Sequence, residues 1–302
     1  MPTLLRSTFL CLAWATLTAQ ENKPAPAKDA SPAAKGGQGR KITIGPDDKA
    51  AFADAPAEAL KVRKDIPHGK LEFVEYDSKS VGTRRRMQVY TPPGFNPAKP
   101  CPVLYLLHGI GGDDKEWQRF ATIDALMDNL IADGKAVPMI IVMPNGRAQK
   151  DDRAVGNVYA GAPAFAAFER DLLDDVIPFI ENRYKAKPLR EQRALAGLSM
   201  GGGQTLNFGF GHPETFASLG AFSAAPNSKA PATLLPDASL AQKYKVLWVS
   251  CGNKDGLLAI SQGVHERLKT QQVAHTWHVD DHGHDGAHWR SALYWFSQKL
   301  FK

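Results

Sequence analysis

The chain has 302 residues and a formal charge of +6, from 37 Lys and Arg against 31 Asp and Glu. Acidic residues are spread among the basic ones, so we expect no nucleic-acid partner, and the small excess of charge suits at most an anionic cell-wall material. No apolar run reaches the ~20 residues that a membrane-spanning helix requires.

The first 19 residues, MPTLLRSTFLCLAWATLTA, have the order of a secretory signal peptide. One cation, Arg6, precedes an apolar run from 9 to about 17, and the small Ala19 marks a cleavage site. We therefore expect a secreted or periplasmic protein that has no membrane attachment after cleavage. The alternative is an N-terminal anchor that stays uncleaved.

Residues 20–61 are rich in Ala, Pro, Lys, Gly and Asp and contain little apolar material, which predicts a flexible lead-in. The remaining residues, 62–302, have the length of one large α/β domain.

The domain opens with two alternating stretches, 70–78 and 84–93, which flank KSVGT and predict an antiparallel hairpin. Short, almost wholly apolar runs then alternate with longer amphipathic segments. The runs lie at 102–109, 138–146, 193–199, 217–224, 245–252 and 275–281, and the amphipathic segments lie at about 119–133, 164–184, 200–211, 257–272 and 287–301. Runs that are apolar on both faces are typical of parallel strands covered by helices on each side. The pattern predicts an α/β three-layer sandwich with a mostly parallel central sheet and an antiparallel start.

Ligands of such sheets bind at the carboxyl ends of the strands, where AGLSMGG places Ser199 between an apolar run and a helix-like run. A serine hydroxyl there becomes a nucleophile when an imidazole accepts its proton and a carboxylate orients that imidazole. Gly197 and Gly201 permit the strained strand-to-helix turn that such a serine occupies. The alternative is that Ser199 is merely a small residue at a tight turn.

The chain order nucleophile, acid, histidine then selects Asp255, in VSCGNKDG, as the acid. Its alternative role is to cap the helix that begins near 257. The base is harder to choose because HTWHVDDHGHDGAHW contains five histidines. The residues alone place His282 and His284 in the loop after the last strand, and either fits.

A tetrahedral intermediate needs two N–H donors for its oxyanion. We expect these donors to be the backbone N–H of Met200, at the start of the nucleophile helix, and that of Ile110, in the glycine-rich loop after LLHG. The alternative for this loop is a plain turn.

A zinc site of the H-x-H-x-D-H type is suggested by HGHDGAH, but the match fails. With His282 and His284 as the first two ligands, Gly286 and Ala287 stand where Asp and His are required. We expect no metal and no cofactor.

Seven blocks together resemble the family-one carbohydrate esterases, especially bacterial feruloyl esterases: LLHGIGG, NLIADGK, IIVMPN, RALAGLSMGGGQTLNFG, FSAAPN, CGNKDGLL and HGHDGAHW. The resemblance runs from about residue 70 to 300. It implies the α/β-hydrolase fold, no cofactor, and a Ser-His-Asp triad of Ser199, His284 and Asp255.

The resemblance also implies the substrate, which is feruloylated or acetylated plant polysaccharide such as arabinoxylan or its oligosaccharides. Trp289, Leu257 and Pro226 are candidate lining residues of the site, with core packing as the alternative. Gly286 stands where the family commonly has an aromatic residue, so we expect a wider acyl pocket. Here His282 replaces a glycine that the family often shows before Gly283.

The sequence thus predicts a secreted serine esterase that hydrolyses feruloyl esters through an acyl-enzyme. Acetyl xylan deacetylation, or hydrolysis of another carboxylic ester on this fold, is the alternative within the same chemistry. A carbohydrate-binding protein without catalysis is the alternative of a different class.

Overall fold

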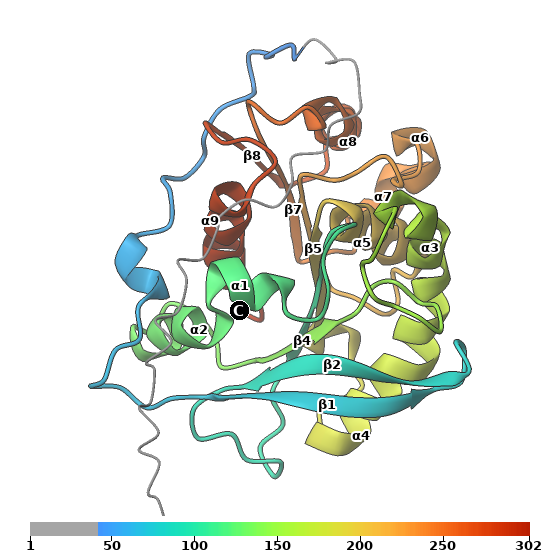
Figure 1. Ribbon diagram of the computed structural model, residues 1–302. Helices are drawn as coiled ribbons and strands as arrows, with labels where there is room; N and C mark the ends of the chain where they lie inside the picture. Colours follow the sequence, from blue (N-terminus) through green and yellow to red (C-terminus); the bar gives the residue numbers. More distant parts are fainter. Residues whose placement is uncertain (1–41) are drawn as a thin grey trace, which may run out of the picture. The chain divides into compact units, whose positions relative to one another are not determined.

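The predicted hairpin forms from β1 (Lys70–Ser78) and β2 (Thr83–Thr91), which pair antiparallel in a continuous register from Lys70 opposite Thr91 to Ser78 opposite Thr83. The computed structural model describes residues 42–302, and the hairpin forms one edge of the eight-stranded sheet in this part of the chain (Figure 1). β2 continues the sheet by pairing antiparallel with β4 (Ile140–Pro144).

The other strands are parallel, in the order β1-β2-β4-β3-β5-β6-β7-β8. They are β3 (Val103–Leu107), β5 (Arg193–Leu198), β6 (Ser218–Phe222), β7 (Val246–Gly252) and β8 (Thr276–Asp280). Because β3, β4 and β6 are buried along their whole length, apolar side chains on both faces have partners. The predicted mostly parallel sheet with an antiparallel start is confirmed.

Helices cover the sheet on both faces (Figure 1). Tyr105 and its same-face neighbours pack against α3 (Ala162–Arg170), α4 (Ile177–Tyr184), α5 (Met200–Gly211) and α8 (Leu258–Thr270). Leu104 and Leu106 face the opposite way, against α1 (Glu116–Ala121), α2 (Ile123–Ala132) and α9 (Gly286–Ser297). Two apolar cores therefore lie on the two sides of one sheet. Shorter elements are α6 (Pro231–Leu234), α7 (Ala238–Ala241), and the 3-10 turns η1 (Ala57–Leu60), η2 (Val158–Gly161) and η4 (Arg190–Gln192).

Two predicted helices differ from the structure. The helix expected at 119–133 is split between α1 and α2 at Thr122, whose φ of 42° is left-handed. The helix expected at 164–184 widens into a π-helical segment, η3 (Asp171–Val176), just before Pro178. Proline lacks the N–H of an ordinary helical turn, and a local widening accommodates that loss.

Residues 42–61 differ from the flexible lead-in that the composition predicts, because they pack on the domain. The Lys49 carbonyl accepts the Val279 N–H at 3.0 Å, and the Phe52 ring stacks between Trp248 and Trp295 with centroids 5.3 and 4.9 Å away. The domain boundary expected at residue 62 therefore lies too late in the chain. The predicted signal peptide and the first part of the lead-in lie outside the described residues.

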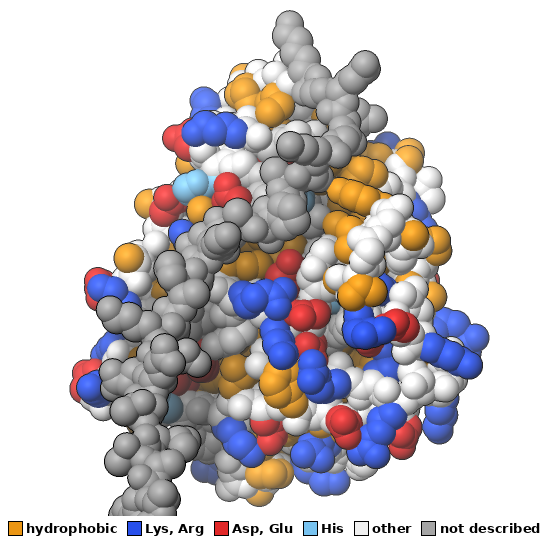
Figure 2. All heavy atoms as spheres, viewed as in Figure 1, with side chains coloured by type: hydrophobic (Ala, Val, Ile, Leu, Met, Phe, Trp, Pro, Cys, Tyr) orange, Lys and Arg blue, Asp and Glu red, His pale blue; other side chains and the backbone are white. Residues whose placement is uncertain are grey.

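The surface carries charges of both signs. Figure 2 shows Lys and Arg side chains interspersed with Asp and Glu on the face viewed in Figure 1. Among the helices of residues 42–302, none has the length and apolar character needed to cross a bilayer.

Candidate active site

Ser199 stands on the sharp turn between β5 and α5, with φ 52° and ψ −118°. A non-glycine residue in this region stores strain on the order of 1–3 kcal/mol, and such strain is typical of functional sites. The two glycines around the turn are required because a side chain at either position would collide with neighbouring backbone. A β-carbon at Gly201 would lie 2.5 Å from the Leu107 carbonyl oxygen, and one at Gly197 would lie 2.5 Å from the Gly201 carbonyl. The turn can form only with glycine at both positions.

The structure brings Ser199, His284 and Asp255 together in one hydrogen-bond chain. His284 Nε2 lies 2.9 Å from Ser199 Oγ, and His284 Nδ1 lies 2.8 Å from Asp255 Oδ2. Because a carboxylate accepts, Nδ1 carries the proton and Nε2 accepts from the serine hydroxyl. Ser199 and Asp255 are buried, while a third of the His284 side chain is exposed. The imidazole is thus the member of the chain that faces solvent.

Asp255 does both things that the sequence allowed. Its Oδ2 accepts from His284, and its Oδ1 accepts the Leu257 N–H at 2.8 Å just before α8. Burial alone raises the pKa of the Asp255 carboxyl, but the hydrogen bond and charge of His284, with the Leu257 N–H, outweigh burial and hold that pKa below its usual value. The carboxylate is therefore charged at neutral pH.

The other four histidines of the C-terminal segment have different partners. His282, the alternative base, lies with its Nε2 2.9 Å from Asp54 Oδ1. His275 contacts His265 at 2.8 Å, while His278 and His288 are buried beside Asp280. Only His284 of these five reaches Ser199.

The predicted oxyanion donors are the backbone N–H groups of Met200 and Ile110. Met200 is the first residue of α5, so its N–H has no acceptor within the helix. The Ile110 N–H makes no hydrogen bond to any described residue. Both N–H groups are therefore free to bind an oxyanion, although they stay predicted donors.

Comparison with known proteins decides the family. The family model named Esterase matches residues 78–298. The chain belongs to the Esterase family. This match agrees with the esterase resemblance drawn from the sequence motifs.

Individual relatives of this esterase-family chain are also esterases by name. It is 34% identical over 247 residues to an endo-1,4-beta-xylanase/feruloyl esterase of Xylanibacter ruminicola, covering 80% of this chain and 32% of that protein. An esterase of Mycobacterium tuberculosis is 29% identical over 175 residues, covering 57% of this chain and 34% of that protein. The chain thus spans about a third of the length of these relatives.

A solved structure shares the fold. The CE1 ferulic acid esterase of the anaerobic fungus Anaeromyces mucronatus superposes with a TM-score of 0.71 at 23% identity, covering 82% of this chain and 96% of that one. The predicted α/β-hydrolase fold is confirmed.

Two charged residues that the sequence motifs did not indicate support the oxyanion loop of this esterase-family chain. Buried Glu116 accepts the Gly109 N–H at 2.7 Å, and buried Arg147 donates to the Ile110 carbonyl at 2.5 Å. Side-chain hydrogen bonds therefore hold the loop backbone just before and just after the Ile110 N–H. Neither residue forms a spaced motif with the loop, so only the folded chain reveals their role.

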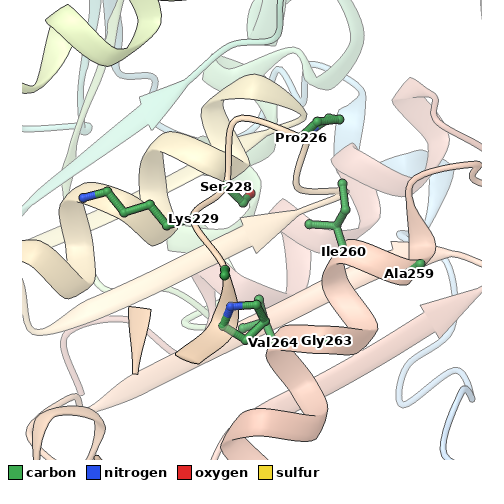
Figure 3. Close-up of a pocket in the computed structure, with 9 residues that line it drawn as sticks. Pro226, Ser228, Lys229, Ala259, Ile260, Gly263 and Val264 are labelled. Atoms are coloured by element: carbon green, nitrogen blue, oxygen red, sulfur yellow. The ribbon is translucent and has the colours of Figure 1, made fainter. Parts of the chain in front are cut away.

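The three candidate lining residues have different surroundings. Trp289 is 8% exposed and packs edge-on against His284, with ring centroids 5.0 Å apart. Leu257 packs on an apolar cluster that includes Phe165 and Met200. Pro226 lines a hollow of about 340 Å³ between the segment after β6 and α8, opposite Ile260 in Figure 3. Ser228, Lys229, Ala230, Pro231, Ala259, Gly263 and Val264 complete its lining.

Gly286 does not leave the gap that we expected. A β-carbon there would lie 3.1 Å from the Phe120 β-carbon, so Phe120 of α1 takes the space. The Phe120 ring in turn packs against Trp289, with centroids 5.5 Å apart. An aromatic side chain thus reaches this place from a different element.

Two groups of side chains in residues 42–302 are close enough to share a cation. They are Asp47, His265 and Glu266, and Asp54, Asp280 and His282. Neither group includes Ser199, His284 or Asp255. The hydrogen-bond chain at Ser199 is therefore separate from both groups.

Proposed function

We propose that this chain is an exported serine esterase that hydrolyses feruloyl and related hydroxycinnamoyl esters of plant cell-wall polysaccharide. The observation that carries the proposal is the hydrogen-bond chain from Asp255 through His284 to Ser199, beside two free backbone N–H groups. Each of the three side chains lies at hydrogen-bonding distance from the next.

The reaction proceeds in two halves. Ser199 Oγ attacks the ester carbonyl while His284 Nε2 accepts the hydroxyl proton, and Asp255 stabilises the resulting imidazolium. The negative oxygen of the tetrahedral intermediate accepts hydrogen bonds from the Met200 and Ile110 N–H groups. When the intermediate collapses, His284 returns the proton to the departing sugar oxygen, which leaves the acyl group on Ser199. Water, deprotonated by His284, then attacks the acyl-enzyme and releases the acid.

The choice of substrate rests on two supports. The side chains of Phe165, Met200, Ile110 and Leu257 form an apolar cluster beside the serine, which suits an aromatic acyl group. In addition, the Xylanibacter ruminicola relative is named a xylanase/feruloyl esterase. Export rests on the signal-peptide pattern, and an exported protein that starts at Gln20 would support it.

Purified protein should hydrolyse methyl ferulate and release ferulate from feruloylated arabinoxylan oligosaccharides. Turnover of p-nitrophenyl acetate without turnover of ferulate would favour the acetyl esterase alternative. Turnover of neither ester, from a folded sample that binds arabinoxylan, would favour the non-catalytic alternative. Activity should survive chelators, and strong inhibition by them would contradict the proposal.

A further inference from the structure

The loop that carries His284 is closed by a buried side-chain bridge. The loop runs from Asp280, the last residue of β8, to the start of α9. The bridge is a hydrogen bond at 2.7 Å, in which His288 Nδ1, in the first turn of α9, donates to Asp280 Oδ2. His288 is fully buried and Asp280 is 5% exposed. The two stems of the loop are therefore tied together below the site.

The bridge continues into the sheet. His288 Nε2 lies 3.1 Å from the hydroxyl of Ser250, which is buried on β7. Since Nδ1 donates its proton to the carboxylate, Nε2 accepts from the Ser250 hydroxyl. Ser250, His288 and Asp280 form a second Ser–His–Asp chain, which we call the inner chain.

Asp280 gathers donors from each neighbouring segment. Its Oδ1 accepts the His282 N–H of the loop at 3.2 Å, and His278 Nε2 lies 3.6 Å from its Oδ2. Burial raises the pKa of the Asp280 carboxyl, but the hydrogen bonds from His278 and His288 outweigh burial and lower that pKa well below its ordinary value. The buried carboxylate is charged and fully engaged.

The same region joins the loops of the proposed base and acid. The Asp280 carbonyl accepts the Asn253 N–H at 2.8 Å, and the His282 carbonyl accepts the Lys254 N–H at 3.0 Å. Residues 253 and 254 directly precede Asp255. The start of the His284 loop is therefore held beside the segment that leads into Asp255, and the Asp280–His288 bridge ties the loop to α9.

We propose that Asp280 and His288 are positioning residues for His284, and that the inner chain sets the distance between this imidazole and Ser199. This inference rests on the proposed function for its kinetic readout. Neither residue touches the reacting atoms. They act through the backbone of the loop that carries the base.

The test compares two buried carboxylates that each accept from a histidine ring and from a backbone N–H. Asp280→Ala removes the bridge and should lower kcat on the order of 10-fold, with KM unchanged, because His284 is misplaced while binding groups stay intact. Asp280→Asn should restore most of kcat. Its amide can donate to His288 Nδ1, and the other tautomer of His288 then donates to the Ser250 hydroxyl, so the bridge survives with its protons reversed.

The matched control is Asp128, which is also buried and accepts from His68 Nδ1 and the Gly69 N–H, both at 2.9 Å, and has no hydrogen bond to a residue of the site. Asp128→Ala should lower Tm yet leave kcat unchanged. A loss of kcat in both Ala variants that follows their loss of Tm would overturn the proposal. A wild-type kcat in Asp280→Ala would also overturn it.

If Asp280→Ala does not fold, His288→Phe replaces it, because phenylalanine keeps a buried ring and removes both nitrogens. The same loss of kcat is expected, and unchanged kcat would overturn the proposal. A second readout does not need activity. The proton resonance of His284 Nδ1–H should shift or broaden in Asp280→Ala and stay unchanged in Asp128→Ala. Absence of ester hydrolysis by the wild-type protein would refute the proposed function alone, since this spectrum would still test the positioning role.

Discussion

Two hydrogen-bond chains of the same three residue types lie on neighbouring elements, and only one of them carries the proposed chemistry. In the outer chain, Ser199 stands on a strained turn beside free N–H groups, and His284 is a third exposed. In the inner chain, Ser250 lies within β7, and its carbonyl accepts the Ser223 N–H at 2.8 Å. Its histidine, His288, is fully buried. Solvent access and backbone donors, rather than the triplet itself, separate a reactive serine from a structural one.

The largest expected effect is at the two serines. Ser199→Ala should lower kcat by on the order of 10⁴-fold or more, because the nucleophile is lost. Ser250→Ala removes one hydrogen bond from the inner chain and should change kcat by only about 2-fold to 3-fold. Rates with p-nitrophenyl acetate check both. Similar losses of kcat in the two variants would contradict the assignment of Ser199 as the reactive serine and Ser250 as a structural one.

The same substitution in the two carboxylates sharpens the comparison. Asp255→Asn should lower kcat by about 10⁴-fold, since its amide favours the His284 tautomer that cannot accept the serine proton. Asp280→Asn should lower kcat only slightly, because its amide can still hydrogen-bond to His288 and keep the bridge. Steady-state kinetics with methyl ferulate across pH 6–9 measure both variants, and a tolerated Asn at 255 would contradict the assigned acid.

The oxyanion loop belongs only to the outer chain, and Glu116 tests it. Glu116→Ala frees the Gly109 N–H and should lower kcat about 10-fold with little change in KM, because a looser loop misplaces the Ile110 donor. Glu181→Ala is the control. It breaks the 2.6 Å ion pair with Arg193 at the opposite end of β5 and should leave kcat unchanged.

The smallest effect on rate is expected at Phe52, in the segment 42–61 that packs on the domain. Phe52→Ala removes the ring between Trp248 and Trp295 and should lower the free energy of unfolding by about 2 kcal/mol. Urea denaturation measures the loss. Phe73→Ala, at a 46% exposed ring on β1, is the control and should cost less. A larger loss at Phe73 would show that residues 42–61 contribute little.

The sequence predicted the sheet well because each buried strand is a separate apolar run. The turn at Thr122 and the widening before Pro178 escaped prediction, since both depend on how a helix fits its neighbours as well as on periodicity. Residues 42–61 were misjudged because one ring, Phe52, and several hydrogen bonds from the backbone of the segment to the domain anchor a segment of polar composition.

The site followed from spacing and chain order as far as Ser199 and Asp255. The residues alone left His282 and His284 open, because their difference lies in Asp54, a residue distant in sequence that pairs with His282. Glu116 and Arg147 were not foreseen, because buried charges that grip a loop leave no local pattern. Spacing reveals groups that react together, while the groups that support them emerge only from tertiary structure.

The contact between Gly286 and Phe120 has a consequence for redesign of the proposed acyl pocket. Introducing a bulky residue at 286 by itself creates a collision with α1, and trimming residue 120 by itself opens a void beside Trp289. Because the two positions contact each other, a search for variants that prefer a different acyl group should vary both positions in one combined library.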